Sequence, residues 1–257
     1  NSLGYVEVLP FMGQIIWDAN FCGHSLRMES MFSEPKPATL IEDTYGCFAF
    51  HSGLLAAGCP GEGDNHPLHG EFACAPMDSA KLIVSNDAIR VVSCCEYLKG
   101  FGNHYLANPA VTLRQDSSMF DIELRVQNLS KYASLHLQYK CHMNYEFVTN
   151  GKITQNLPVE AVKRREAVPA HVYPTENWLK INADIRAGNR DANSLEGAEE
   201  FDPEIVYFAD AVDEMTKEAI IELDSQNGTV FETRFSTESF PVVTRWILHN
   251  ADQKVAA

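Results

Sequence analysis

Strict alternation of apolar and polar residues constrains the fold of this chain more than any other sequence feature. In Phe120–Asn128, Phe, Ile, Leu and Val alternate with Asp, Glu, Arg and Gln, which is the period of a β-strand with one buried and one solvent-facing side. Leu135–Tyr145 alternates in the same way. Short apolar runs bounded by turn residues recur along the chain without a helical pattern between them. The sequence therefore predicts an all-β fold, a large antiparallel β-sandwich.

The length fits one such unit. The chain has 257 residues, and β-sandwiches of this size often form a single domain. We therefore expect one domain over residues 1–257, with Glu176–Glu200 as a long irregular insertion. Because the chain starts without Met and stops after a strongly apolar strand pattern, we also expect a longer protein whose last strands follow Ala257.

The charge of the chain limits the partners that it can bind, and its cysteine content indicates the cellular compartment. The formal net charge is −15 and no long Lys/Arg run occurs, so the chain would repel nucleic acid. No apolar run approaches the about 18 residues of a membrane span. The seven cysteines show no repeated spacing, which favours reduced thiols in the cytoplasm over a disulfide framework. The oligomeric state is left open.

A polar loop is the first candidate for chemistry. Asp64–Glu71, which we call the histidine loop, places two imidazoles and two carboxylates within eight residues. It lies in a Gly- and Pro-rich segment, and loops on rigid scaffolds often carry functional groups. A solvated polar loop after the turn Gly58–Gly61 is the alternative. His66 and His69 could exchange protons near neutral pH, because an unperturbed imidazole has a pKa of about 6.5.

His142 is the second candidate, since the alternation of Leu135–Tyr145 places it on the polar face of a strand with Lys140 and Asn144. Two histidines and a carboxylate could open a sugar ring, if one group takes the anomeric proton and another protonates the ring oxygen. His51 follows an apolar strand pattern and could instead be a structural histidine.

A metal site is a rival interpretation of the same residues. His51, Asp64, His66 and Glu71 are types that bind Zn²⁺ or Mn²⁺. However, Pro67 disfavours a helix across the histidine loop, and the spacing matches no established metal motif. We therefore expect neither a metal nor another cofactor.

Several motifs, taken in order, resemble the galactose mutarotase-like superfamily and in particular its aldose 1-epimerase-like branch. The resemblance spans most of the chain except Glu176–Glu200. The motifs are Leu9–Asp18, Tyr45–Gly53, His66–Glu71, Val126–Leu129, His142–Tyr145 and Phe240–Trp246.

This resemblance implies a supersandwich whose concave face holds a sugar. His69 matches the histidine of the Leu-His-Gly motif that binds the substrate, and His142 matches the general acid that protonates the ring oxygen. The general base of the superfamily is a glutamate on a strand after the one that matches Phe240–Trp246. It would lie at or beyond Ala257, since Glu232 comes one strand too early.

The sequence thus predicts an aldose 1-epimerase-like protein that acts at the anomeric carbon of a small-molecule sugar, with His142 and His69 as catalytic residues. A non-catalytic carbohydrate-binding protein and a metal-dependent isomerase or lyase remain alternatives. Trp246 could offer an apolar face to the sugar and Arg245 a donor. The predicted substrate-binding residues are His51, Asp64, His66, Glu71, Asn144, Arg245 and Trp246.

Overall fold

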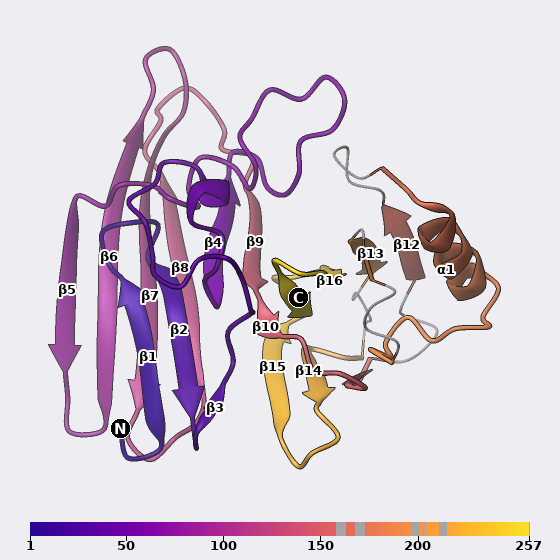
Figure 1. The fold of residues 1–257 in the computed structure, drawn as a ribbon. Helices are drawn as coiled ribbons and strands as arrows, with labels where there is room; N and C mark the ends of the chain where they lie inside the picture. Colours follow the sequence, from indigo (N-terminus) through magenta and orange to yellow (C-terminus); the bar gives the residue numbers. More distant parts are fainter. Residues whose placement is uncertain (158–162, 168–172, 197–200, 203, 211–214, 257) are drawn as a thin grey trace. The chain divides into compact units, whose positions relative to one another are not determined.

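A computed structural model describes residues 1–157, 163–167, 173–196, 201–202, 204–210 and 215–256 (Figure 1). Its contacts group the chain into two compact units, Asn1–Asn144 and Tyr145–Ala257, and each unit is described by itself. Both consist mainly of antiparallel sheets, which confirms the predicted all-β class. A single domain over 1–257 stays a prediction. No helix in the described ranges is long and apolar enough to cross a membrane.

The first unit is built from two sheets. One has the order β1-β2-β4-β9, with β3 paired to β2, and the other has the order β5-β6-β7-β8. The first sheet contains β1 (Gly4–Leu9), β2 (Ile15–Phe21), β3 (His24–Ser25), β4 (Ala49–Leu54) and β9 (Gln138–Met143). The second contains β5 (Ser79–Val84), β6 (Ala88–Leu98), β7 (His104–Arg114) and β8 (Phe120–Asn128). A short 3-10 helix, η1, covers Ile41–Thr44.

Apolar side chains from both sheets form the core of this unit. Leu54 of β4 and Tyr105 of β7 are fully buried and pack in one cluster with Phe72. Leu124 and Val126 of β8 pack against this cluster, whereas the residues that alternate with them, Glu123, Arg125 and Gln127, are exposed. The alternation in Phe120–Asn128 therefore predicted the buried side of β8 correctly.

The described residues of the second unit form two further antiparallel sheets and one helix. The five-stranded sheet has the order β10 (Tyr145–Glu146), β17 (Lys254–Ala256), β16 (Val242–His249), β13 (Ile205–Asp210) and β12 (Lys163–Ala167). The three-stranded sheet has the order β11 (Lys152–Gln155), β14 (Glu218–Asp224) and β15 (Val230–Ser236).

The helix α1 (Glu176–Arg186) corrects the expectation that Glu176–Glu200 is irregular throughout. Thr175 caps its start, because the Thr175 side chain accepts a hydrogen bond from the Trp178 backbone N–H at 3.2 Å. Trp178 and Ile181 lie three residues apart and are both buried, so one face of α1 packs on the unit. Residues 197–200 of the expected insertion lie outside the described residues.

Candidate functional site

The pairing of β4 with β9 positions the candidate site in the first unit. Phe50 is paired with His142, and Ser52 is paired with Lys140. Directly paired residues lie on the same face of a sheet, and so do residues two apart on one strand. These four side chains therefore share one face. The His142 ring stacks on Phe50 with 4.7 Å between ring centroids and an interplanar angle of 15°.

The histidine loop brings His69 to this face. The His69 backbone N–H donates to the Gly58 carbonyl at 2.9 Å, and the His69 carbonyl accepts from the Gly53 N–H at 2.9 Å. Its ring Nδ1 is 3.1 Å from the Ser52 hydroxyl. The rings of His69 and His142 are perpendicular, at 89°, with centroids 4.8 Å apart. Two histidines that are 73 positions apart in the sequence thus form one pair.

Gly70 explains why the Leu-His-Gly motif suits this position. Gly70 has φ +80°, and a Cβ there would lie 2.0 Å from the Ala56 carbonyl oxygen and 2.6 Å from that of Gly53. Only glycine allows the loop to approach β4 this closely. His69 itself has φ +62°, so several contacts of the surrounding chain hold it in a left-handed conformation.

Tyr45 contacts both histidines of the pair. Its hydroxyl is 3.4 Å from His142 Nε2, and its ring centroid is 6.1 Å from that of His69. The side chain is 8% exposed. Tyr45, Phe50 and Ser52 thus surround the pair with two aromatic rings and a hydroxyl.

Burial and positive charge keep both imidazoles of the pair neutral. Burial is the main cause that lowers the pKa of His142 to about 3, with a further contribution from the charge of Lys140, while Asn144 opposes the shift through a side-chain hydrogen bond. The pKa of His69 is lowered well below its usual value, first by burial and then by His142, Lys140 and His66. At neutral pH the pair can accept protons but carries no charge.

Glu71 anchors the histidine loop to the sandwich. Its Oε1 accepts hydrogen bonds from the backbone N–H of Leu54 at 2.9 Å and of Leu55 at 3.1 Å. The Tyr105 hydroxyl donates to the same oxygen at 2.8 Å. Three donors on one carboxylate oxygen tie the loop to the end of β4 and to β7. The contacts of Glu71 are therefore those of a structural anchor, whereas the sequence suggested a substrate contact.

Asp64 and His66 bind within their own loop. Asp64 accepts a hydrogen bond from the Gly61 N–H at 2.7 Å. His66 Nδ1 is 2.9 Å from the Pro67 carbonyl oxygen, and its Nε2 is 3.9 Å from Asp64. His66 contributes a little to the lowered pKa of His69, but the hydrogen bonds of Asp64 and His66 are to nearby positions of the chain.

His51 points to the other face of β4. It lies between Phe50 and Ser52, so its side chain projects away from the pair. It is 1% exposed, and its Nδ1 is 2.8 Å from the Tyr139 hydroxyl. Burial lowers the pKa of His51 to about 4. This geometry favours the structural interpretation of His51 that the sequence left open.

Asn144 supports the end of β9. Its side-chain amide donates to the Cys47 carbonyl at 3.0 Å, and its backbone N–H donates to the Phe48 carbonyl at 2.6 Å. The residue is fully buried. Because Asn144 follows His142 by two positions, these bonds fix the strand that carries the histidine.

The four residues of the metal hypothesis each have different partners. Glu71 and His51 contact separate tyrosines, and Asp64 and His66 stay within the histidine loop. In the described part of the chain, no group of three or more His, Cys, Asp and Glu side chains is arranged to hold a metal ion. None of the seven cysteines forms a disulfide.

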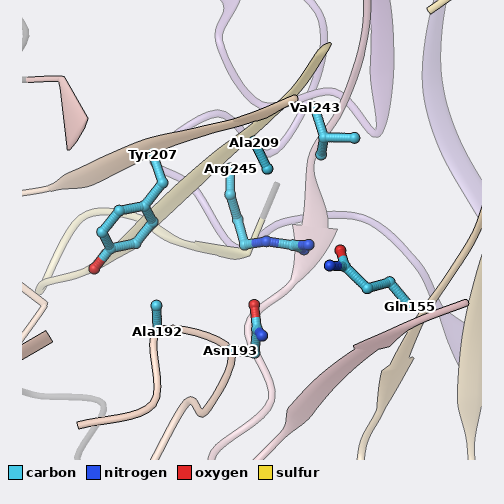
Figure 2. Close-up of a pocket in the computed structure, with 7 residues that line it drawn as sticks. All are labelled: Gln155, Ala192, Asn193, Tyr207, Ala209, Val243 and Arg245. Carbon is cyan, nitrogen blue, oxygen red and sulfur yellow. The ribbon is translucent and has the colours of Figure 1, made fainter. Parts of the chain in front are cut away.

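Arg245 and Trp246 belong to the second unit. They are neighbours on β16, so their side chains project from opposite faces of that strand. The Trp246 indole N–H donates to the Glu204 carboxylate. Arg245 lines a small cavity of about 20 Å³ together with Gln155, Asn193 and other side chains (Figure 2). That volume holds water rather than a sugar.

Sequence reasoning missed four members of the site: Tyr45, Phe50, Ser52 and Lys140. Lys140 had a usable signal, because it lies two positions before His142 on the same predicted face. The other three stand in the motif Tyr45–Gly53 that carries the resemblance, but they were given no role, because their places beside the histidine pair depend on contacts between segments distant in the sequence.

The fold and the site together define an all-β protein in which β4, β9 and the histidine loop form a buried pair of histidines. The chain belongs to the family described as Domain of unknown function (DUF4432), whose profile matches residues 5–257. A search of curated proteins finds no match. A crystal structure of a putative aldose 1-epimerase from Klebsiella pneumoniae subsp. pneumoniae MGH 78578 is similar, with a TM-score of 0.78 and 14% sequence identity. The alignment covers 98% of this chain and 66% of that one, and it confirms the expected fold.

Proposed function

We propose that this protein is an aldose 1-epimerase-like isomerase of carbohydrate metabolism that interconverts the anomers of a sugar by opening its ring. The observation that carries the proposal is the His69–His142 pair, with ring centroids 4.8 Å apart on one face of the first unit. A pair of imidazoles at this separation can contact two oxygens of one pyranose. None of the seven cysteines forms a disulfide, which is consistent with a cytoplasmic protein.

The two histidines take opposite roles in the proposed reaction. His69, kept neutral by burial, accepts the proton of the anomeric hydroxyl. His142 in its protonated form gives a proton to the ring oxygen, so that the C1–O5 bond breaks and an open-chain aldehyde forms. Rotation about the C1–C2 bond and reversal of both transfers closes the ring as the other anomer. His142 must gain a proton before this step, since its pKa in the unliganded protein is about 3.

The low pKa of His142 also favours a second candidate, a carbohydrate-binding protein without catalysis. In that case the Phe50 and Tyr45 rings and the neutral imidazoles bind a sugar, and no proton reaches the ring oxygen. Binding and anomer exchange are separate measurements, so the two candidates are distinguishable.

The test is exchange NMR of α and β anomers with a panel of aldoses and acidic aldoses. We expect exchange above the buffer rate for at least one sugar, and we expect His142→Gln to lower it by about 10²- to 10⁴-fold, the usual contribution of one acid–base group. His136→Gln, at an exposed position of the same unit, is the matched control and should not change the rate. Saturable binding without exchange would favour the carbohydrate-binding candidate. A His142→Gln rate equal to that of the unmodified protein would refute the catalytic role.

A further inference from the structure

Ser52 places a buried hydroxyl against the ring of His69. It lies on β4 and is fully buried, and its Oγ is 3.1 Å from His69 Nδ1. Two backbone groups contact the same oxygen. The Gly58 N–H donates to it at 3.2 Å, and the hydroxyl donates to the His69 carbonyl at 3.3 Å. Because solvent does not reach it, this hydroxyl depends on protein groups such as these for its hydrogen bonds.

The number of protons and lone pairs on the Ser52 hydroxyl decides how the three contacts are shared. A serine hydroxyl has one proton to donate and two lone pairs that accept. The Gly58 N–H can only donate and the His69 carbonyl can only accept, so these two groups use one lone pair and the hydroxyl proton. The second lone pair is left for His69 Nδ1. All three contacts are hydrogen bonds only if Nδ1 carries a proton and donates to Ser52.

The opposite tautomer of His69 loses one of these hydrogen bonds. If Nδ1 carried no proton, the Ser52 hydroxyl would have to turn toward it, and the His69 carbonyl would keep only the Gly53 N–H at 2.9 Å. A hydrogen bond lost inside a protein costs free energy, and buried polar groups are nearly always bonded. The contacts of Ser52 therefore favour the Nδ1–H tautomer, in which Nε2 holds the lone pair of the neutral ring.

The backbone around His69 holds the ring and the hydroxyl in this arrangement. The His69 N–H donates to the Gly58 carbonyl at 2.9 Å, and the Gly58 N–H bonds to Ser52. The Gly53 N–H, next to Ser52 in the chain, donates to the His69 carbonyl. Each partner of the Ser52 hydroxyl is thus fixed by backbone hydrogen bonds, so the tautomer follows from the fold and needs no ligand.

We propose that Ser52 is a positioning residue that fixes His69 in the Nδ1–H tautomer, so that Nε2 accepts the proton of the anomeric hydroxyl. The inference rests on the proposed function and adds to it a residue that acts through His69. The proton moves from the anomeric oxygen to Nε2, and the electron pair of that O–H bond forms the C1=O bond as C1–O5 breaks. The Ser52 oxygen stabilises the resulting imidazolium through its hydrogen bond with Nδ1–H. Ring closure returns the proton from Nε2.

The first test measures the tautomer directly by long-range ¹H–¹⁵N NMR of the histidine rings, in which protonated and unprotonated ring nitrogens have different ¹⁵N shifts. The ring signals are assigned from the His69 backbone resonances. We expect the unmodified protein at neutral pH to show His69 protonated at Nδ1 and unprotonated at Nε2. The measurement needs neither a sugar nor a variant. A His69 ring protonated at Nε2 would overturn the inference.

The second test substitutes Ser52. Ser52→Ala removes the hydroxyl and should let the His69 ring populate both tautomers. For an exchanged sugar it should lower kcat by about 10- to 100-fold and leave KM nearly unchanged, since either tautomer can bond a sugar hydroxyl. Ser52→Thr keeps a hydroxyl and should keep the Nδ1–H tautomer and part of the rate.

Ser93→Ala is the matched control. Ser93 is also fully buried, and its hydroxyl donates to the Pro10 carbonyl at 2.7 Å and accepts from the Gln14 side chain at 3.0 Å. It lies on β6, in the other sheet of the first unit. Ser93→Ala should therefore lower stability without changing the His69 tautomer or kcat.

The outcomes separate this inference from the proposed function. An unchanged tautomer in Ser52→Ala would overturn the inference and leave the proposed function standing, whether or not kcat falls, because a fall in kcat alone would indicate a structural role. If Ser52→Ala does not fold, the tautomers of the unmodified protein and of Ser52→Thr decide. If the unmodified protein exchanges no sugar, the proposed function fails, and NMR alone decides the role of Ser52. An Nδ1–H tautomer that is lost in Ser52→Ala then supports that role, and one that persists overturns it.

Discussion

Because His51 is buried in its neutral form, we expect acid to lower the free energy of unfolding of the first unit. His51 is 1% exposed, and burial lowers its pKa from 6.5 to about 4. In the unfolded chain it regains a pKa of about 6.5 and binds a proton more readily than in the folded protein. The free energy of unfolding is therefore unaffected by His51 above pH 6.5, falls as the pH drops from about 6.5 to about 4, and falls no further below that.

The magnitude follows from the two pKa values. Between pH 7 and pH 5, linkage gives a loss of about 2 kcal/mol from His51 alone. The limiting loss at lower pH is about 3 kcal/mol, since one pKa unit corresponds to about 1.36 kcal/mol. The first value is a sizeable fraction of the about 5–15 kcal/mol that stabilises an average protein.

Urea unfolding of the unmodified protein and of His51→Gln at pH 7, 6 and 5 measures this contribution. The variant weakens the contact with Tyr139 at every pH, so the comparison uses the change in unfolding free energy with pH rather than its absolute value. Carboxylates that titrate in this range are common to both proteins and cancel. We expect the loss between pH 7 and pH 5 to be smaller by about 2 kcal/mol in His51→Gln. His136→Gln, exposed in the same unit, should keep the original loss. Parallel curves for the unmodified protein and His51→Gln would refute the reasoning.

Two substitutions in the histidine loop test how it is held. Glu71→Gln should lower the free energy of unfolding by about 1–3 kcal/mol, because an amide cannot accept the three hydrogen bonds of the carboxylate equally well; an unchanged urea midpoint would contradict this. Gly70→Ala places a Cβ 2.0 Å from a carbonyl oxygen and should cost more than about 2 kcal/mol and displace His69. Gly63→Ala is its control, since Gly63 has a similar φ of +87° but nothing within 4 Å of the added Cβ; equal losses for the two variants would show that the contact is unimportant.

The fold could be predicted from the sequence where the pattern of apolar and polar residues lies within a single strand. The alternation of Phe120–Asn128 is a property of one strand, and β8 has these bounds. The helix α1 was missed because only two of its apolar residues, Trp178 and Ile181, are buried, and they lie among charged and amide side chains. An element is thus hardest to predict from the sequence where its few buried apolar residues lie among many polar ones.

The site could be predicted only in part, because the pairing of strands that are distant in the sequence decides which residues belong to it. The sequence placed His142 on the polar face of its strand, but it could not show that Phe50 and His69 cover that face. The role of Glu71 depends on Tyr105, which is 34 positions away. Ser52 and Lys140 become neighbours only through the register of β4 with β9, which the sequence does not reveal.

The buried histidines of the first unit differ in what lowers their pKa values. This difference distinguishes a histidine that affects only stability from the two that the proposed reaction uses. For His51 the only resolved cause is burial, so nothing that binds to the opposite face of β4 relieves it. For His69 and His142 burial is joined by the charge of Lys140. A ligand that changes the solvation or the charge beside the pair would therefore shift the pKa of these two histidines and leave that of His51, on the opposite face of β4, unchanged.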